Sequence, residues 1–292
     1  MGWIEMVESM ADNPWPATKP RIYANPYEFA HFMPVINLYS CNFVGYNPMQ
    51  KMKEVVPFIG SVATKSEQVG QMFDDISPSY DLLNHTLSFG IDKLWRKKLV
   101  AILKKEQPQT ILDIATGTGD LAIAMVGTQA AHITGIDISE GMLKVGRQKI
   151  AAKGLGDIIS LEYGNSEFLS YKDNSFDAVT VSFGVRNFEH LSIGLQEIYR
   201  VLKPGGTLAI LEFSQPQHFP MKQLYQFYFT TICPLVGRVV SGNSRAYSYL
   251  HESVAQFPFG QQFTGILQET GFKHTTWRTL TTGISTIYSA KK

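Results

Sequence analysis

Cysteine is scarce in this chain. Its 292 residues include two cysteines, Cys41 and Cys233, and neither lies in a CxxC motif or in a cluster spaced for a metal ion. A disulfide framework is therefore not expected, and the chain suits a reducing, cytoplasmic compartment. The seven histidines are scattered without paired spacing, so the sequence predicts no metal centre.

An excess of charge of either sign is also missing. Lys and Arg number 26 and Asp and Glu number 25, which gives a formal net charge of +1. Such a balance does not attract the chain to polyanions, so we expect no nucleic-acid partner. Long apolar runs are absent as well, because the most apolar stretch, residues 227–240, contains Pro234 and Arg238 and is too short to span a bilayer. Any membrane contact is therefore expected to be peripheral, at the inner face of the membrane.

Proline is crowded into the first part of the chain. Residues 1–64 hold seven of the 14 prolines, and no helical or alternating period survives that spacing. We therefore predict an irregular N-terminal extension over residues 1–64 and one folded domain over residues 65–292.

Strand and helix patterns alternate through most of that domain. This alternation, with strands that are apolar throughout, predicts an α/β doubly wound and mostly parallel sheet. A late helix and two further strands would bring the sheet to seven strands, and residues 215–258 interrupt the rhythm as an aromatic, helical insertion. The strands are predicted at residues 110–115, 132–138, 158–163, 176–183, 206–213, 272–279 and 284–290, and the helices at 68–74, 92–105, 119–126, 139–153, 191–202 and 261–270.

A glycine turn follows the first predicted strand. Asp113 lies in the strand, Gly117 and Gly119 follow it, and Asp137 ends the second strand 20 positions after Gly117. Glycines let a ligand approach the backbone, and a carboxylate at that distance can accept both hydroxyls of a ribose. The combination predicts a cofactor that contains a nucleoside. The alternative is an ordinary turn followed by a surface carboxylate.

The glycine turn also fits the GxGxxA form of a dinucleotide site. Tyr199 and Lys203 even have the Tyr-x3-Lys spacing of short-chain dehydrogenases, so an NAD-dependent dehydrogenase is an alternative. Lys203, however, ends its predicted helix directly before Pro204, where it would not lie beside a nicotinamide. We therefore expect Tyr199 to pack and Lys203 to be solvated.

Three sequence blocks carry a family resemblance. They are YDLLN with LSFG at residues 80–90, SFGVRN at 182–187, and RVLKPGG at 200–206. With them, residues 66–292 resemble the ubiquinone/menaquinone biosynthesis C-methyltransferases. The resemblance implies a class I, Rossmann-like methyltransferase that uses S-adenosylmethionine and no metal. One position departs from the family, which usually has His where this chain has Asp92.

The resemblance also implies which residues bind the cofactor. Asp113, Gly117 and Gly119 would shape the glycine turn. Asn165 and Ser166 would lie beside the adenine, although Gly-Asn is ordinary turn chemistry and a plain turn is the alternative. The residues expected to hold the cofactor are Thr118, Asp137, Asn165, Ser166 and Ser182.

The same resemblance implies C-methylation of a polyprenylated hydroquinone. Arg186 is expected to stabilise the phenolate, because arginine stays protonated and is not a base, and Asn187 is expected to orient the hydroxyl. The alternative is that Arg186 pairs with Glu189 or Glu212 as scaffolding. A non-catalytic scaffold in quinone assembly is a further alternative for the whole chain.

The insertion is expected to bind the substrate. Its apolar side chains suit a polyprenyl tail, and Tyr225, Tyr247 and Tyr249 are the expected substrate contacts. The alternative is a core helix or a contact with a second copy in a homodimer. By resemblance, the SFGID variant at residues 88–92 favours demethylmenaquinol as the substrate. The ubiquinol precursor remains the alternative substrate. The apolar set is Tyr225, Phe227, Tyr228, Phe229, Ile232, Val236, Val239 and Val240.

The N-terminal extension is expected to be dispensable. By resemblance a short leader precedes residue 65, and Met49 and Met52 lie where a start would leave that length. The competing interpretation is an arm that docks on a membrane. Residues 1–48 offer only Lys19 and Arg21 against four acidic side chains, which argues against that arm.

Overall fold

The computed structural model of the chain describes residues 55–232 and 244–292. Most of the predicted extension therefore lies outside the described residues, and its last part, residues 55–64, contains no helix or strand. The first helix, α1 (Lys65–Ile76), begins where Thr64 and Glu67 form a reciprocal capping box. This cap satisfies two backbone N–H groups that a helix start leaves without partners.

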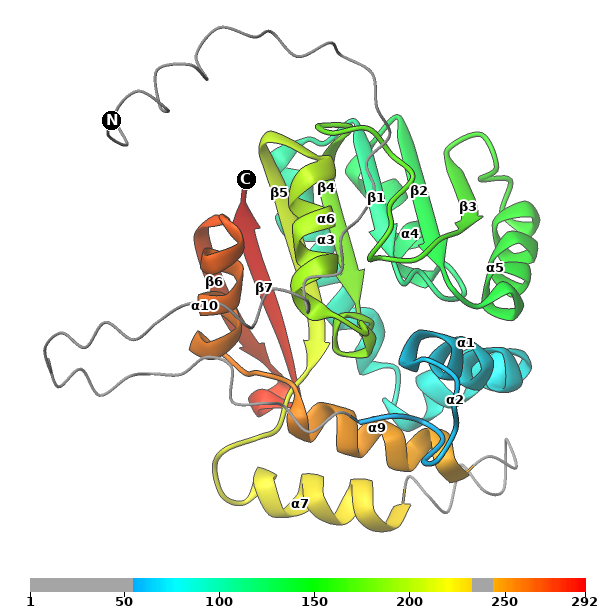
Figure 1. Cartoon of the computed structure of the whole chain (residues 1–292), viewed down its shortest axis with the longest axis vertical. Coiled ribbons are helices and arrows are strands. Elements are labelled where there is room, and N and C mark those ends of the chain that lie inside the picture. The colour runs from blue at the N-terminus through cyan, green and yellow to red at the C-terminus, as the bar shows by residue number, and fades with distance from the viewer. Residues whose placement is uncertain (1–54, 233–243) are drawn as a thin grey trace, which may run out of the picture. The chain divides into compact units, whose positions relative to one another are not determined.

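The predicted seven-stranded sheet is confirmed (Figure 1). Its order is β3-β2-β1-β4-β5-β7-β6, and the first five strands are parallel whereas β7 runs antiparallel to both of its neighbours. This doubly wound order gathers the carboxyl ends of β1, β2 and β4 at one edge. The strands are β1 (Thr110–Ile114), β2 (His132–Asp137), β3 (Ile159–Tyr163), β4 (Phe176–Ser182), β5 (Leu202–Phe213), β6 (Lys273–Leu280) and β7 (Ser285–Lys291).

One strand boundary differs from the prediction by more than one residue. The proline and glycines at residues 204–206 suggested that the fifth strand starts at residue 206, but β5 begins at Leu202. The register of β5 against β4 shifts between Phe176 and Ala178. This irregularity absorbs the extra residues, so the strand passes through the Pro-Gly-Gly segment instead of starting after it.

Alternate residues of the strands face two hydrophobic layers. Leu112 and Val179 face α6 (Leu191–Val201) and α10 (Gln261–Thr270). Ile111 and Ala178, their neighbours along the strands, face the opposite layer. Burial on both faces explains why these strands are apolar without interruption. The opposite layer consists of α3 (Ile91–Glu106), α4 (Asp120–Met125) and α5 (Glu140–Ala152).

A helical cap covers the carboxyl ends of the strands (Figure 1). Buried side chains of α1, the insertion and α5 meet there in one cluster, to which Met72, Tyr225, Phe229 and Tyr249 belong. The described part of the insertion is mainly helical, as predicted, whereas α2 was not anticipated. No helix in the described ranges is both long and apolar enough to cross a bilayer. The cap helices are α1, α2 (Tyr80–Leu87), α7 (Met221–Phe227), the π-helix Tyr228–Ile232 and α9 (Ser244–Gln256).

Candidate active site

The glycine turn after β1 is built from left-handed backbone. Ala115, Gly117 and Gly119 all have positive φ, at 54°, 57° and 77°. Gly117 lies on the wall of a cavity, and a Cβ built there would meet no protein atom within 4 Å. The missing side chain therefore leaves open space at the point where a ligand would approach the backbone.

Asp137 at the end of β2 is tied to that turn. Its Oδ2 accepts from the Gly117 N–H at 2.8 Å, and its Oδ1 accepts from the Ser139 N–H at 2.9 Å. Burial raises the pKa of Asp137 to about 6, although the backbone donors oppose this shift. The carboxyl is therefore mainly ionised at neutral pH and lines the same cavity as Gly117, where it can accept hydroxyl groups.

We call this space the cofactor cavity. It lies at the carboxyl ends of β1, β2 and β4 and brings together Gly117, Asp137, Asn165, Ser166 and Ser182, five of the residues predicted from sequence. The Ser182 hydroxyl oxygen is buried without a hydrogen-bond partner among the described residues. Because buried polar groups are normally paired, this hydroxyl fits a site that a polar ligand completes.

Asn165 takes part in a turn and also lines the cofactor cavity. Its Oδ1 accepts from the Glu167 N–H at 2.9 Å, as in an Asx turn, and its Nδ2 donates to the Ser66 hydroxyl at 3.2 Å. The turn alternative is therefore present. Asn165 and Ser66 nevertheless both line the cofactor cavity, so the turn itself forms part of the wall.

The structure does not bring Asp113, Thr118 or Gly119 to that wall. Asp113 accepts hydrogen bonds from Thr116 and Thr180, at 2.7 and 2.6 Å, and so ties the turn to β4. Burial raises its pKa to about 6 as well. Gly119 precedes α4 in a left-handed conformation.

Thr118 is the clearest departure from the expected cofactor contacts. Its hydroxyl donates to Asp81 at 2.6 Å and accepts from Lys149 at 3.1 Å. The Thr118 hydroxyl thus already has two charged partners, Asp81 and Lys149. Its side chain belongs to the charged network that these residues form with α2.

A second space, the middle cavity, adjoins the first. Phe73, Tyr80 and Phe183 line both cavities and so form their common wall. Arg186 lines the middle cavity and pairs through Nη1 with Glu212 at 2.7 Å, so the Glu212 alternative is present. The Arg186 Nε also donates to the Ser253 hydroxyl at 3.3 Å.

Asn187 and Tyr249 connect the two cavities. The Tyr249 hydroxyl donates to the Asn187 Oδ1 at 3.1 Å, and Asn187 lines the cofactor cavity whereas Tyr249 lines the middle cavity. Burial raises the pKa of Tyr249 to about 12, so its hydroxyl stays a donor at neutral pH. Arg186 and Asn187, adjacent in sequence, therefore face different spaces.

A third space, the apolar cavity, continues from the middle cavity. It has a volume of about 470 Å³ and shares Asn84, Phe213 and Leu250 with the middle cavity. Val236, Val239 and Val240 of the predicted apolar set lie outside the described residues, as does the side chain of Tyr247. The remaining members line this cavity: Tyr225, Phe227, Tyr228, Phe229 and Ile232.

Sequence reasoning missed Phe73 and Tyr80, although both separate the cofactor cavity from the middle cavity. Tyr80 opens the YDLLN block, which was recognised as a motif without a role for its tyrosine. Burial raises the pKa of Tyr80. Its position in a recognised block was the only signal available before the structure.

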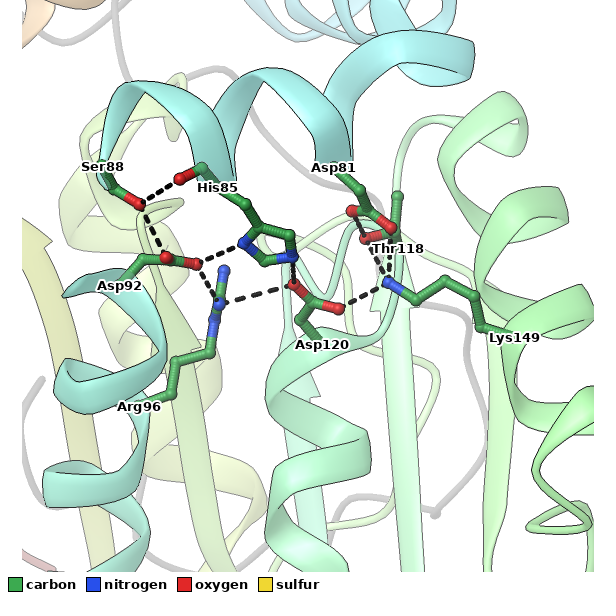
Figure 2. A network of polar contacts seen from close by, with 8 residues as sticks. All are labelled: Asp81, His85, Ser88, Asp92, Arg96, Thr118, Asp120 and Lys149. Atoms are coloured by element: carbon green, nitrogen blue, oxygen red, sulfur yellow. Dashed lines mark hydrogen bonds and ion pairs between the residues drawn. The ribbon is translucent and has the colours of Figure 1, made fainter. Parts of the chain in front are cut away.

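Charged side chains join α2 and α3 to the glycine turn (Figure 2). Asp92 is buried and accepts from Ser88 and Arg96, both at 2.6 Å. Burial alone would raise the pKa of Asp92, but these hydrogen bonds and the nearby positive charges lower it below its usual range. The network consists of Asp81, His85, Ser88, Asp92, Arg96, Thr118, Asp120 and Lys149.

Three members of this network approach the spacing of metal ligands. His85, Asp92 and Asp120 offer ligand atoms within 4.8 Å of one another, the one such group in the described ranges. Arg96 and Lys149 already hold these carboxylates, at 2.6 Å from Asp92 and in direct contact with Asp120. Because a metal would have to displace these cations, we interpret the group as an ion-pair network.

The positions of Tyr199 and Lys203 do not support the dehydrogenase alternative. Tyr199 packs edge to face on Phe272, with ring centroids 5.1 Å apart, and Lys203 pairs with Asp177 at 2.7 Å. Neither residue lines the three cavities. The expectation that Tyr199 packs is confirmed.

Comparison with known proteins identifies the family of the chain. The model of the ubiE/COQ5 methyltransferase family matches residues 51–292. The demethylmenaquinone methyltransferase of Bacteroides fragilis is 48% identical over 84% of this chain and 99% of its own length. The ubiquinone/menaquinone biosynthesis C-methyltransferase of Geotalea daltonii is 45% identical over 78% of this chain and 97% of its own length.

A solved structure supports the fold alone. It is a S-adenosylmethionine-dependent methyltransferase from Thermotoga maritima, 19% identical, with a TM-score of 0.55 over 76% of this chain and 99% of that chain. The long family match and the high identity of the relatives identify the family and the activity as well as the fold. The chain belongs to the ubiE/COQ5 methyltransferase family and is an S-adenosylmethionine-dependent methyltransferase.

Proposed function

We propose that this chain transfers a methyl group from S-adenosylmethionine to a ring carbon of a polyprenylated hydroquinone, and that the hydroquinone is demethylmenaquinol. The observation that carries the proposal is the series of three adjoining cavities. The cofactor cavity meets the middle cavity at Tyr80 and Phe183, and the middle cavity meets the apolar cavity at Phe213 and Leu250.

The cavities differ in polarity in the way such a substrate requires. The middle cavity presents Arg186 and Tyr249, which suit the oxygens of a hydroquinone ring. The apolar cavity is walled by aromatic and aliphatic side chains and measures about 470 Å³, within the usual range for small-molecule sites. A ring in the middle cavity would therefore point its prenyl tail into the apolar cavity.

The cofactor cavity has the donors and acceptors for S-adenosylmethionine. Asp137 would accept the two ribose hydroxyls, since the Gly117 and Ser139 N–H groups already fix its orientation. Asn165 and Ser166 would lie at the adenine, and the unpartnered Ser182 hydroxyl would complete the polar wall. The bound cofactor supplies a methyl group on a sulfonium, and no metal is part of the proposal.

Arg186 is proposed to activate the ring. Loss of a hydroxyl proton raises the electron density on the ortho carbon, and a fixed donor stabilises the phenolate that forms. That carbon would take the methyl group as the methyl–sulfur bond breaks, and S-adenosylhomocysteine would leave. The hydrogen of the same ring carbon would then be lost as a proton to water, which restores the aromatic ring. Glu212 holds the guanidinium in place, while Nη2 makes no hydrogen bond or ion pair with the described residues. Because Glu212 offsets the charge of Arg186, the contribution comes chiefly from a directed hydrogen bond. Arginine does not release its proton, so water takes the proton from the hydroxyl.

Asn187 and Tyr249 are proposed to orient the ring. Their mutual hydrogen bond of 3.1 Å spans the wall between the two polar cavities, where the methyl group must pass. While that bond is in place, a hydroxyl of the ring can donate to the Tyr249 oxygen or accept from the Asn187 Nδ2. Positioning of this kind reduces the entropy that the transfer step would otherwise lose.

A direct assay tests the head group. The purified chain is given methyl-labelled S-adenosylmethionine and one of two hydroquinones with the same short prenyl tail, one with a naphthalene ring and one with a benzene ring. We expect ring methylation of the naphthalene compound, as the name of the Bacteroides fragilis relative suggests. Methylation of the benzene compound alone would overturn the head-group assignment. Transfer to neither, with cofactor binding intact, would favour the scaffold alternative.

A further inference from the structure

Four large apolar side chains are exposed around the mouth of the apolar cavity. We call them the rim: Phe89, Leu94, Leu224 and Phe227, whose exposed fractions are 82%, 55%, 57% and 59%. Three of them line the cavity itself. Leu94 lies in an adjoining hollow that shares Ile91, Trp95 and Thr281 with it. Single exposed apolar residues are ordinary, but a cluster that continues into a cavity marks an interaction surface.

The backbone at Phe89 supports this interpretation. Phe89 lies in the turn between α2 and α3 with φ of 52°, a left-handed conformation that a bulky residue rarely adopts. The ring gains little burial inside the protein in return, because it is the most exposed of the rim residues. A strained backbone that presents an exposed aromatic ring is best explained by a partner that covers the ring.

Positive charge flanks the rim. Lys97 and Lys98 are exposed on α3 one turn after Leu94, Lys93 is exposed directly before Leu94, and Lys222 is exposed on α7 two residues before Leu224. The acidic residues of α3 are Asp92, which is buried, and Glu106, at the other end of the helix, and α7 has none. Apolar side chains flanked by lysines without exposed carboxylates match the surface of an anionic bilayer.

We propose that the rim docks on an anionic lipid bilayer and opens the apolar cavity to the acyl chains. A prenyl tail dissolved in the membrane would then enter the cavity without crossing water. The role of the tail rests on the proposed function, whereas docking itself needs no quinol. The two parts are therefore tested separately.

The first experiment measures vesicle binding of the full chain without quinol. Vesicles contain phosphatidylcholine alone, or phosphatidylcholine and phosphatidylglycerol in equal parts. We expect binding to the anionic vesicles only, weakened about tenfold by Phe89→Ser and similarly by Leu94→Ser. Phe168→Ser is the matched control, because Phe168 is 74% exposed on the loop after β3 and lines neither the apolar cavity nor the hollow beside it.

A second pair of variants tests the charge. Replacement of Lys97 and Lys98 by Gln should weaken binding to anionic vesicles on the order of 30-fold, and added salt should weaken binding of the original chain in the same way. The control replaces Lys104 and Lys105, exposed at the other end of the same helix, and should bind as the original chain does. Equal effects of the two pairs would overturn the proposed surface.

Activity separates this proposal from the proposed function. Leu94→Ser should methylate a short-tailed hydroquinone in detergent as the original chain does, but lose activity on a long-tailed hydroquinone in vesicles. Vesicle binding through the rim without methyl transfer would refute the function and leave the docking intact. Equal vesicle binding by the original chain and the rim variants would refute the docking. A change from dimer to monomer in the rim variants, with vesicle binding unchanged, would identify the rim as a self-contact instead.

Discussion

The affinity for S-adenosylmethionine should fall in mild acid because of Asp137. Burial raises the pKa of this carboxyl to about 6 in the protein without ligand. Ribose hydroxyls donate to the ionised form, so binding requires the proton to leave. The ionised fraction falls from about nine-tenths at pH 7 to about one-tenth at pH 5, which predicts a dissociation constant about tenfold larger at pH 5.

Calorimetric titration with S-adenosylmethionine at pH 5, 6 and 7 measures this effect. Asp137→Asn keeps the shape of the side chain and cannot ionise. Its affinity should be lower at pH 7 by about 1.5–3 kcal/mol, the usual contribution of hydrogen bonds to charged groups, and should not change with pH. Asp113→Asn is the matched control, because Asp113 has the same raised pKa of about 6 but lies away from the cofactor cavity.

Unfolding in acid does not mimic this result through these two groups. A carboxyl whose pKa is raised in the folded state binds its proton more tightly there than in the unfolded chain. The stability it contributes is fully present below its unfolded pKa and is lost as pH rises through about 6. Asp113 and Asp137 therefore favour the folded state at pH 5, which thermal unfolding at each pH can check. Affinity that is constant between pH 5 and 7 would refute the role of Asp137, and so would a tenfold loss that persists in Asp137→Asn.

Three further predictions concern other parts of the molecule. Arg186→Lys should lower kcat about a hundredfold and leave cofactor affinity within about twofold, because lysine keeps the charge but loses the planar fork; normal turnover would exclude the directed hydrogen bond. Asp92→Asn should lower the free energy of unfolding in urea by about 3 kcal/mol by leaving Arg96 poorly paired, whereas Glu140→Gln, in an exposed pair, should change it by less than about 1 kcal/mol; equal small effects would show that the network contributes little. A chain that begins at Met52 should bind S-adenosylmethionine in calorimetry as the full chain does, since the family match starts at residue 51, and a loss of binding would show that the extension is needed.

The sheet could be predicted because its signals are local. Each strand is a short apolar run between turn residues, and this pattern needs no knowledge of distant parts of the chain. Two features escaped prediction for equally physical reasons. Helix α2 has only eight residues, one of them buried, so it shows little periodicity. The early start of β5 depends on its pairing with β4. The Pro-Gly-Gly segment suggests a turn, so the sequence alone does not indicate this pairing.

The same difference between local signals and distant contacts decides which residues of the candidate site could be predicted. Gly117 and Asp137 were found because their spacing along two neighbouring strands is a local signature, and the structure joins them by a hydrogen bond of 2.8 Å. The role of Thr118 depends on Asp81 and Lys149, which lie 37 and 31 positions away in sequence. Competition between a ligand and distant side chains for one hydroxyl cannot be judged before the fold is known.

The charged network indicates a role for Asp92, the position at which this chain departs from the family pattern. Asp92 holds Ser88, directly before the exposed Phe89, and it holds Arg96, which also approaches Asp120 at 3.4 Å. Asp120 starts α4, directly after the glycine turn. The turn that carries a rim residue and the turn at the cofactor cavity are therefore joined by adjacent ion pairs.

This connection follows from charge balance as well as geometry. Asp81, Asp92 and Asp120 face two permanent cations, and His85 becomes the third cation when it is protonated. Removal of one buried carboxylate leaves its partner without compensation, and the strain is shared by α2, α3, α4 and α5 because each contributes a member. The effects of changes within a network of contacting charges are not additive, so a change in one turn is expected to alter the other. A carboxylate at position 92 thus contributes to the shape of both turns through its partners, and it also lines the middle cavity.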